Sequence, residues 1–179
     1  MYLVSIYFDS ITDQKIREII GQIAKNSQNK AMLDGNIPPH ITISAFESRQ
    51  ELQKEKQIIS LLDAPFSKLE RQSLQWVSVG AFFPHVLYLM PVLNSYLHNI
   101  SLTVSQHLQT IEDLSIRPYY QPFHWLPHTT VAKNLSTQEM LRAFETLQKS
   151  FGMFSGKVIK IGLSKTNPYH DIQIWELKC

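Results

Sequence analysis

Two short segments of the sequence place histidine and threonine at the same spacing. The first reads PHITI over residues 39–43, and the second reads PHTTV over residues 127–131. Histidine titrates near neutral pH, so one imidazole of a pair can be neutral while the other is protonated. Such a pair supplies the base that activates water and the acid that protonates a departing oxygen. The two motifs therefore predict acid–base chemistry on a phosphodiester, carried by His40 and His128.

The residues around both histidines follow the pattern of β-strands, in which side chains alternate between the two faces. Alternation predicts that His40, Thr42 and Ser44 share one face of the first strand. It also places His128 and Thr130 together on the second strand. Each imidazole would then lie about 7 Å from a threonine hydroxyl along its strand. If the strands face one another, these groups converge on a space for one phosphate, whose oxygens the hydroxyls can contact.

Hydrophobic periodicity predicts the elements that position the motifs. Capping signals are expected where Ser10 precedes Asp13, Ser48 precedes Glu51 and Ser136 precedes Glu139. Helices are predicted from Ser10, from Ser48 to about residue 62, over 93–114, and from Ser136. Strands are predicted over residues 2–8, 40–46, 66–82, 85–91, 128–132, 156–164 and 171–178.

The predicted order is strand, helix, strand, helix, strand, repeated once from about His85 and followed by an extra strand. Each pass has its Pro-His-x-Thr sequence at the start of its second strand. This weak internal repeat predicts an α+β fold in which two similar lobes face each other. No long linker separates the passes, so residues 1–179 are expected to form a single bilobed domain.

Composition limits the classes of protein that remain. The chain of 179 residues has a formal net charge of +2, which is too weak to argue for duplex nucleic acid but compatible with a short anionic substrate. Its one cysteine, Cys179, allows no internal disulfide, so a reducing compartment is expected. Neither a signal peptide nor a membrane-spanning segment is recognised. We expect a cytoplasmic monomer without membrane contact.

The two motifs resemble the double His-x-Thr-x signature of the two-histidine phosphoesterase superfamily, whose best-known bacterial and archaeal branch is the 2′-5′ RNA ligase or RNA 2′,3′-cyclic phosphodiesterase family. The resemblance rests on residues 40–46 and 128–133 and extends to element order and length. It implies a bilobed antiparallel α+β fold with the site in its cleft. It also implies metal-independent catalysis without a cofactor, in which His128 acts as base and His40 as acid while Thr42 and Thr130 hold phosphate. Ile43 and Val131 stand where leucine is more usual.

Four further residues are weaker candidates for substrate contact. Lys133 ends the second motif, although strict alternation from His128 points it to the opposite face. Arg117 enters a loop rich in proline and aromatic residues, where a solvated surface role is the simpler interpretation. Tyr120 and Trp125 lie in the same loop, and either an aromatic stack on a nucleobase or simple anchoring of the loop fits their chemistry.

Several functions are compatible with these residues. The first is hydrolysis of 2′,3′-cyclic phosphate on RNA ends or nucleotides. The alternatives are the reverse reaction, formation of a 2′-5′ bond between RNA ends, and a module that binds nucleotides or RNA ends without turnover. A structural protein with two ordinary strand histidines remains the simplest competing explanation. Neither motif contains a carboxylate, so no metal is expected at the site.

Overall fold

The computed structural model describes residues 1–48 and 51–179, and the side chains outside residues 49–53. It confirms the predicted α+β class and the order of the main elements. The short helix α2, the short strand β5 and a 3₁₀ turn were not predicted. In chain order the elements are β1 (Tyr2–Phe8), α1 (Ser10–Ser27), α2 (Ala31–Asp34), β2 (His40–Ser48), α3 (Glu51–Phe66), β3 (Gln72–Phe82), β4 (Val86–Pro91), α4 (Ser95–Leu108), β5 (Leu114–Ile116), the 3₁₀ turn (Pro118–Tyr120), β6 (Thr129–Ala132), α5 (Thr137–Ser150), β7 (Phe154–Lys165) and β8 (His170–Glu176).

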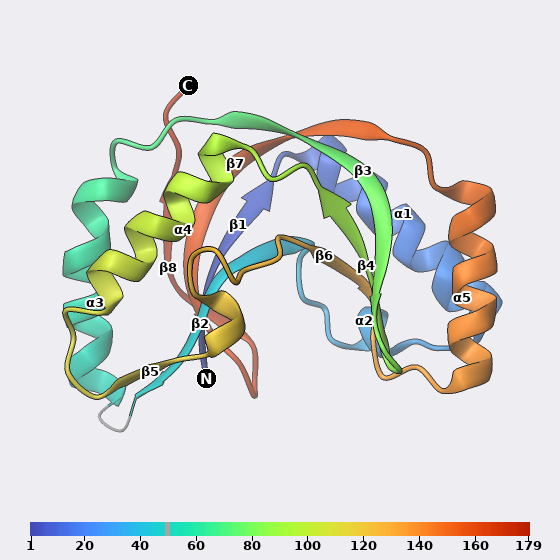
Figure 1. Cartoon of the computed structure of the whole chain (residues 1–179), viewed down its shortest axis with the longest axis horizontal. Coiled ribbons are helices and arrows are strands. Elements are labelled where there is room, and N and C mark those ends of the chain that lie inside the picture. Colours follow the sequence, from blue (N-terminus) through green and yellow to red (C-terminus); the bar gives the residue numbers. More distant parts are fainter. Residues whose placement is uncertain (49–50) are drawn as a thin grey trace.

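The eight strands of the described residues join one antiparallel sheet, in the order β5-β2-β1-β7-β3-β4-β6, with β8 also paired to β7. The long strand β7 connects the two parts of the sheet. Strand β1 pairs along one edge of β7. On the other edge, the first residues of β7 pair with β3 and its later residues pair with β8. The two motif strands, β2 and β6, are far apart in this order, but the sheet curves and brings them into contact (Figure 1).

The helices pack in two pairs, which lie on opposite sides of the view in Figure 1. Helix α1 packs against α5, and α3 packs against α4. Each pair takes one helix from each pass of the repeat, so neither pass forms a separate body. Both passes share one sheet and pair their helices with each other, and the predicted division into two similar facing lobes stays a prediction. Buried aliphatic and aromatic side chains fill the space between the helices and the sheet.

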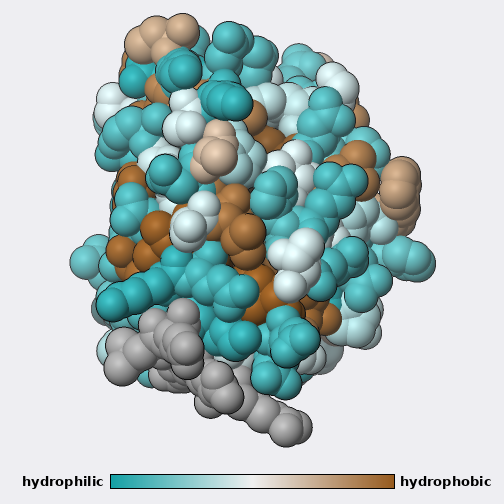
Figure 2. All heavy atoms as spheres, turned by 90° about the vertical axis from the view of Figure 1, so that its left-hand side faces the viewer, coloured by the Kyte–Doolittle hydropathy of each residue, from teal (hydrophilic) through white to brown (hydrophobic). Residues whose placement is uncertain are grey.

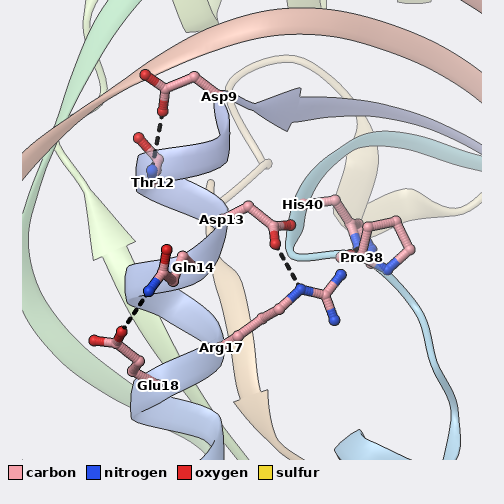
Figure 3. A network of polar contacts seen from close by, with 8 residues as sticks. All are labelled: Asp9, Thr12, Asp13, Gln14, Arg17, Glu18, Pro38 and His40. Carbon is pink, nitrogen blue, oxygen red and sulfur yellow. Dashed lines mark hydrogen bonds and ion pairs between the residues drawn. The ribbon is translucent and has the colours of Figure 1, made fainter.

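Local interactions at the helix ends differ in part from those predicted. Helix α1 is capped by Asp9, whose Oδ1 accepts from the Thr12 backbone N–H at 3.0 Å, and not by the predicted Ser10 (Figure 3). Helix α5 has the predicted capping box, formed by Ser136 and Glu139. The signal predicted between Ser48 and Glu51 falls on residues 49–50, which lie outside the described residues.

Two element boundaries also differ from prediction. The strand expected over 66–82 starts at Gln72, because α3 continues to Phe66, whose ring packs edge-on against Trp175 with centroids 5.1 Å apart. The helix expected over 93–114 ends at Leu108. The apolar residues that follow it, Ile111 and Leu114, extend its pattern but lie in a turn and in β5.

On the side where α3 and α4 face the solvent, apolar surface runs as a band between polar side chains (Figure 2). A groove of about 190 Å³ lies between these helices, and it is lined by Pro65, Phe66, Leu69, Tyr96, Asn99, Ile100 and Thr103. Among the helices of residues 1–48 and 51–179, none is long and apolar enough to cross a membrane.

Candidate active site

The two motif histidines lie at the beginnings of the two motif strands. His40 is the first residue of β2, and His128 immediately precedes β6. Both side chains are partly exposed. Figure 3 shows His40 beside Pro38, where the chain enters β2 next to α1. Contact between β2 and β6 brings the two motifs to one region of the sheet.

Each imidazole contacts the backbone carbonyl oxygen of the residue two positions before it. Nδ1 of His40 lies 2.8 Å from the carbonyl oxygen of Pro38, and Nδ1 of His128 lies 2.8 Å from that of Leu126. A carbonyl oxygen accepts only, so Nδ1 carries the hydrogen in each neutral ring. Nε2 is then the nitrogen that can take up or release a proton. The two neutral rings therefore share one tautomer, in which Nε2 is the proton acceptor.

A tyrosine on the neighbouring strand lies beside His40. Tyr7 of β1 pairs with His40 in register, and the ring centroids are 6.2 Å apart. The Tyr7 ring also covers Gly162 of β7, where an added Cβ would lie 2.9 Å from Tyr7 Cε2. A side chain at position 162 would meet Ile174 Cδ1 at 2.6 Å as well as this ring, so the glycine permits both side chains to pack here.

His128 has an equivalent neighbour. Tyr88 of β4 lies 5.3 Å from His128 between ring centroids, and Phe82 lies 4.9 Å away edge-on. The Tyr88 ring covers Gly80 of β3, where an added Cβ would collide with Tyr88 Cζ. Histidine, tyrosine and glycine thus occupy three adjacent strands in both halves of the site. This repeated arrangement was not evident from the sequence.

A β-bulge follows the threonine of the first motif. Thr42 pairs with Ser5, but Ser44 pairs with Val4, which leaves Ile43 as an extra residue on β2. An extra residue reverses the alternation of side chains beyond it. The prediction that Ser44 shares a face with His40 and Thr42 was therefore wrong, because Ser44 pairs with Val4, a residue of the core.

The second motif has a bulge at the matching place. Thr130 pairs with Tyr88 and Ala132 with Leu87, so Val131 is the extra residue on β6. Beyond the bulge the alternation is reversed, which directs Lys133 to the face that carries Thr130. The parity argument against Lys133 was therefore wrong. Its charge also reaches His40, whose pKa it lowers.

Charges around the two histidines are unequal. Burial is the main cause that lowers the pKa of His40 below its ordinary value of 6.5, and the charges of His128 and Lys133 lower it further. The contact with the Pro38 carbonyl and, to a lesser extent, the carboxylate of Asp171 oppose these effects and raise the pKa of His40. Burial also lowers the pKa of His128, opposed by its contact with the Leu126 carbonyl. Both imidazoles are thus biased towards the neutral form in the free protein.

The two motif threonines differ in their surroundings. Thr42 is buried, and its backbone carbonyl accepts a hydrogen bond from Trp125 Nε1 at 2.9 Å. Its side chain interacts with the hydroxyl of Tyr120, whose pKa is raised mainly by burial. Thr130 is partly exposed. Trp125 and Tyr120 therefore anchor the aromatic loop to the first motif, which agrees with the simpler of their two predicted roles.

Arg117, the remaining candidate, lies at the surface. Its Nη2 lies 2.6 Å from Glu47 Oε1, and both side chains are about half exposed. Its backbone N–H donates to the Ala45 carbonyl. These contacts match the surface role that the sequence favoured for this residue.

A polar network beside His40 was missed by sequence reasoning. The hydroxyls of Tyr7 and Tyr169 lie 2.8 Å apart, and both reach Asp171 Oδ1, at 3.3 and 3.0 Å respectively. Burial raises the pKa of Tyr7 and keeps its hydroxyl protonated. Within the described part of the chain, no group of three or more His, Cys, Asp or Glu side chains is arranged to hold a metal ion. Metal independence itself stays a prediction.

Comparison with solved structures shows the same fold in other proteins. TT0787 of Thermus thermophilus superposes with a TM-score of 0.66 at 11% identity, over 99% of this chain and 97% of that one. Escherichia coli LigT complexed with 3′-AMP gives 0.63 at 18% identity, over 99% and 98%. A protein described as a phosphoesterase gives 0.58 at 17% identity, over 99% and 98%.

Comparison at the level of sequence gives the family. No curated protein matches the sequence. A profile of the 2′-5′ RNA ligase superfamily matches residues 11–168, a range that includes both histidine motifs. This match covers most of the 179 residues. The chain therefore belongs to the 2′-5′ RNA ligase superfamily, a family of phosphoesterases and RNA ligase-like enzymes.

Proposed function

We propose that this protein hydrolyses 2′,3′-cyclic phosphate on RNA ends or nucleotides, with His40 and His128 as its acid–base pair. The observation that carries the proposal is the matched pair of imidazoles, each with Nδ1 held by a backbone carbonyl. A base must accept a proton through a free nitrogen, and an acid must donate one from a ring of fixed orientation. The Nδ1–carbonyl contact leaves Nε2 of each ring for such proton transfer, and contact between β2 and β6 supports a joint action of the two rings.

The proposed reaction transfers two protons around one displacement at phosphorus. The base removes a proton from water while the water oxygen bonds to phosphorus. The bond from phosphorus to one ribose oxygen breaks, and the acid protonates that oxygen. The products are a phosphate monoester and a free ribose hydroxyl. The histidines end with exchanged protonation states, and proton exchange with solvent restores them.

We assign the base to His128 and the acid to His40, following the family resemblance. Lys133 lowers the pKa of His40 in the free protein, whereas Asp171 raises it. A bound phosphate would offset the charge of Lys133 and add its own negative charge, so binding favours the protonated form of His40. An acid that becomes protonated as substrate binds suits the proposed step.

Thr42, Thr130 and Lys133 are proposed to hold the phosphate. The threonine hydroxyls can donate to non-bridging oxygens, and an ammonium group stabilises the charge that develops on them. The bulges after Thr42 and Thr130 support this role, because such irregularities re-aim side chains near active sites. The bulge in β6 supports a position of Lys133 on the face that carries Thr130. These residues and the histidines provide the polar groups without a metal ion or cofactor.

Nucleotide substrates are supported by the structural neighbour LigT, which has been crystallised with 3′-AMP. Both proposed motifs belong to one chain, so a single copy supplies the whole site. We propose that the protein acts as a monomer in the reducing cytoplasm, where its one exposed cysteine, Cys179, stays free. The superfamily description also favours a second candidate activity, 2′-5′ ligation of RNA ends, which is the reverse of a related phosphodiester cleavage.

A direct assay tests the proposal and separates these activities. The purified protein is incubated with 2′,3′-cyclic nucleotides and with RNA ending in a cyclic phosphate, in the presence of a chelator. Formation of a phosphate monoester supports hydrolysis. Joined RNA on addition of a second strand with a free 5′-hydroxyl supports ligation instead. If the protein binds these RNAs but forms neither product, the third candidate is favoured, a module that recognises RNA ends without turnover.

A further inference from the structure

A pocket of about 470 Å³ lies between the start of α4 and the aromatic loop that precedes the second motif, and the proposed chemistry does not use it. This volume lies within the usual range for pockets that bind small ligands. The pocket is lined by Leu93, Asn94, Ser95, His98, Ser101, Phe123 and Trp125.

Aromatic side chains form part of the wall of this pocket. Phe123 is 82% exposed, and its ring centroid lies 4.9 Å from that of His98. The backbone of Phe123 has φ of 67°, which is uncommon for a bulky residue. An exposed aromatic ring in this conformation presents a surface on which another flat ring can stack.

A buried polar group also lines the pocket. Ser101 of α4 is 2% exposed, and its Oγ has no hydrogen-bond partner among the described residues. A buried hydroxyl without a partner is unfavourable and calls for a ligand or water. The first turn of α4 adds backbone N–H groups beside Ser95; the Asn94 side chain satisfies only that of Leu97. The pocket thus combines apolar ring faces with hydrogen-bonding groups.

Trp125 connects this pocket with the proposed active site. It lines the pocket, and its Nε1 donates to the backbone carbonyl of Thr42. It also lies three residues before His128 in the same loop. The pocket and the two motifs are therefore connected through Trp125 and the loop that carries it.

We infer that this pocket binds a nucleobase of the RNA strand that leads to the cyclic phosphate, an inference that rests on the proposed function. A base has apolar faces for Phe123 and a polar edge for groups such as Ser101. The seven lining residues include no Lys or Arg, which argues for a base in preference to a backbone phosphate. The preferred substrate is then a short single-stranded RNA end, and a free cyclic mononucleotide lacks this contact.

The test compares two substrates, a 2′,3′-cyclic mononucleotide and a tetranucleotide that ends in a 2′,3′-cyclic phosphate. The measured quantity is the ratio of kcat/KM for the tetranucleotide to kcat/KM for the mononucleotide. Phe123→Ala should lower this ratio about 5- to 100-fold, the scale expected for the loss of one stacked base. Phe123→Gly removes the ring but suits the positive φ, so it should lower the ratio equally. Phe123→Tyr should preserve it.

Phe144→Ala is the matched control, because it removes a partly exposed phenylalanine from α5. It should leave the ratio unchanged. An unchanged ratio in both Phe123→Ala and Phe123→Gly would overturn the inference, as would an equal loss on both substrates. A ratio lowered in Phe123→Ala but not in Phe123→Gly would also overturn it, because the ring would then be irrelevant.

A binding measurement keeps the inference testable if the proposed function fails. Fluorescence anisotropy would follow a labelled tetranucleotide that ends in a 3′-phosphate. Phe123→Ala and Phe123→Gly should weaken its binding by a similar factor, while Phe144→Ala should not. If the wild-type protein turns over neither cyclic substrate but shows this pattern, the proposed function is wrong and the base pocket stands. Equal binding by all variants would reject the pocket by itself.

Discussion

Lys133 and Ala45 occupy equivalent positions, each five residues after a motif histidine and each beyond a β-bulge. Only one of them carries a charge. The two halves of the candidate site are otherwise alike in their histidine contacts and in the tyrosine and glycine beside them. Lys133 therefore breaks the symmetry of the site, and its influence on the pKa of His40 makes the two imidazoles chemically distinct.

Replacing Lys133 should affect both substrate binding and the pH dependence of the reaction. Lys133→Met should lower kcat/KM by about 10-fold or more, since it removes one charged contact to phosphate. The substitution also removes a cation that lowers the pKa of His40, so this pKa should rise. The alkaline limb of the pH profile of kcat/KM should then move to higher pH. Lys149→Met, on the outer helix α5, should change neither quantity, and an identical pH profile in Lys133→Met would argue against its proximity.

The pH profile of the wild-type protein should be bell-shaped, because the active form has one neutral and one protonated histidine. Burial lowers the pKa of both imidazoles below 6.5, so this form is most populated on the acidic side of that value in the free protein. The profile of kcat/KM should therefore have its maximum below about pH 6.5 and decline towards neutral and alkaline pH. The two limbs belong to the coupled pair and not to single residues. A flat profile from about pH 5 to 9, with chemistry rate-limiting, would exclude the histidine pair.

A substrate with a good leaving group can separate the roles of acid and base. A nitrophenyl phosphodiester needs no protonation of its leaving oxygen. On this substrate His40→Ala should lose much less turnover than His128→Ala, because only the base is still required. Turnover rates would be compared at saturating substrate to remove differences in binding. Equal losses would show that the assignment of His40 as acid is wrong.

Threonine substitutions should have smaller effects than the histidine substitutions. Thr42→Val and Thr130→Val each remove one hydroxyl while keeping the shape of the side chain, so each should lower kcat by less than about 10²-fold. Thr130→Val is the cleaner test, since the Thr42 hydroxyl also interacts with Tyr120. Thr103→Val on α4 serves as control. An unaffected kcat in both motif variants would remove the threonines from the proposed transition-state contacts.

The positions of the two motifs could be predicted from the sequence because they depend on local patterns. Strand alternation placed His40 with Thr42, and helical periodicity located the elements around them. The register of β1 with β2 confirms the shared face of His40 and Thr42, as these residues pair with Tyr7 and Ser5. Beyond the threonines this reasoning failed, since one extra residue in each strand reverses the alternation and no local signal marks it.

The network beside His40 depends on long-range contacts that local patterns do not encode. Tyr7 and Tyr169 are 162 positions apart in the sequence and meet because β1 and β8 both pair with β7. The position of Asp171 at the start of the last strand, directly after a turn, gave no reason to place it near the site. The end of α4 was also predicted wrongly from local spacing. The apolar residues Ile111 and Leu114 continue the helical spacing of α4, although they lie in a turn and in β5.

The most direct test of the central claim measures hydrolysis of a 2′,3′-cyclic nucleotide by single histidine variants. Wild-type protein should release the nucleoside monophosphate. His40→Ala and His128→Ala should each lower turnover by about 10²–10⁴-fold, the usual contribution of a general acid or base. His107→Ala, which removes a histidine from the far end of α4, should behave as wild type. Circular dichroism should show that all variants are folded; near-wild-type turnover by either motif variant would contradict the proposed histidine pair.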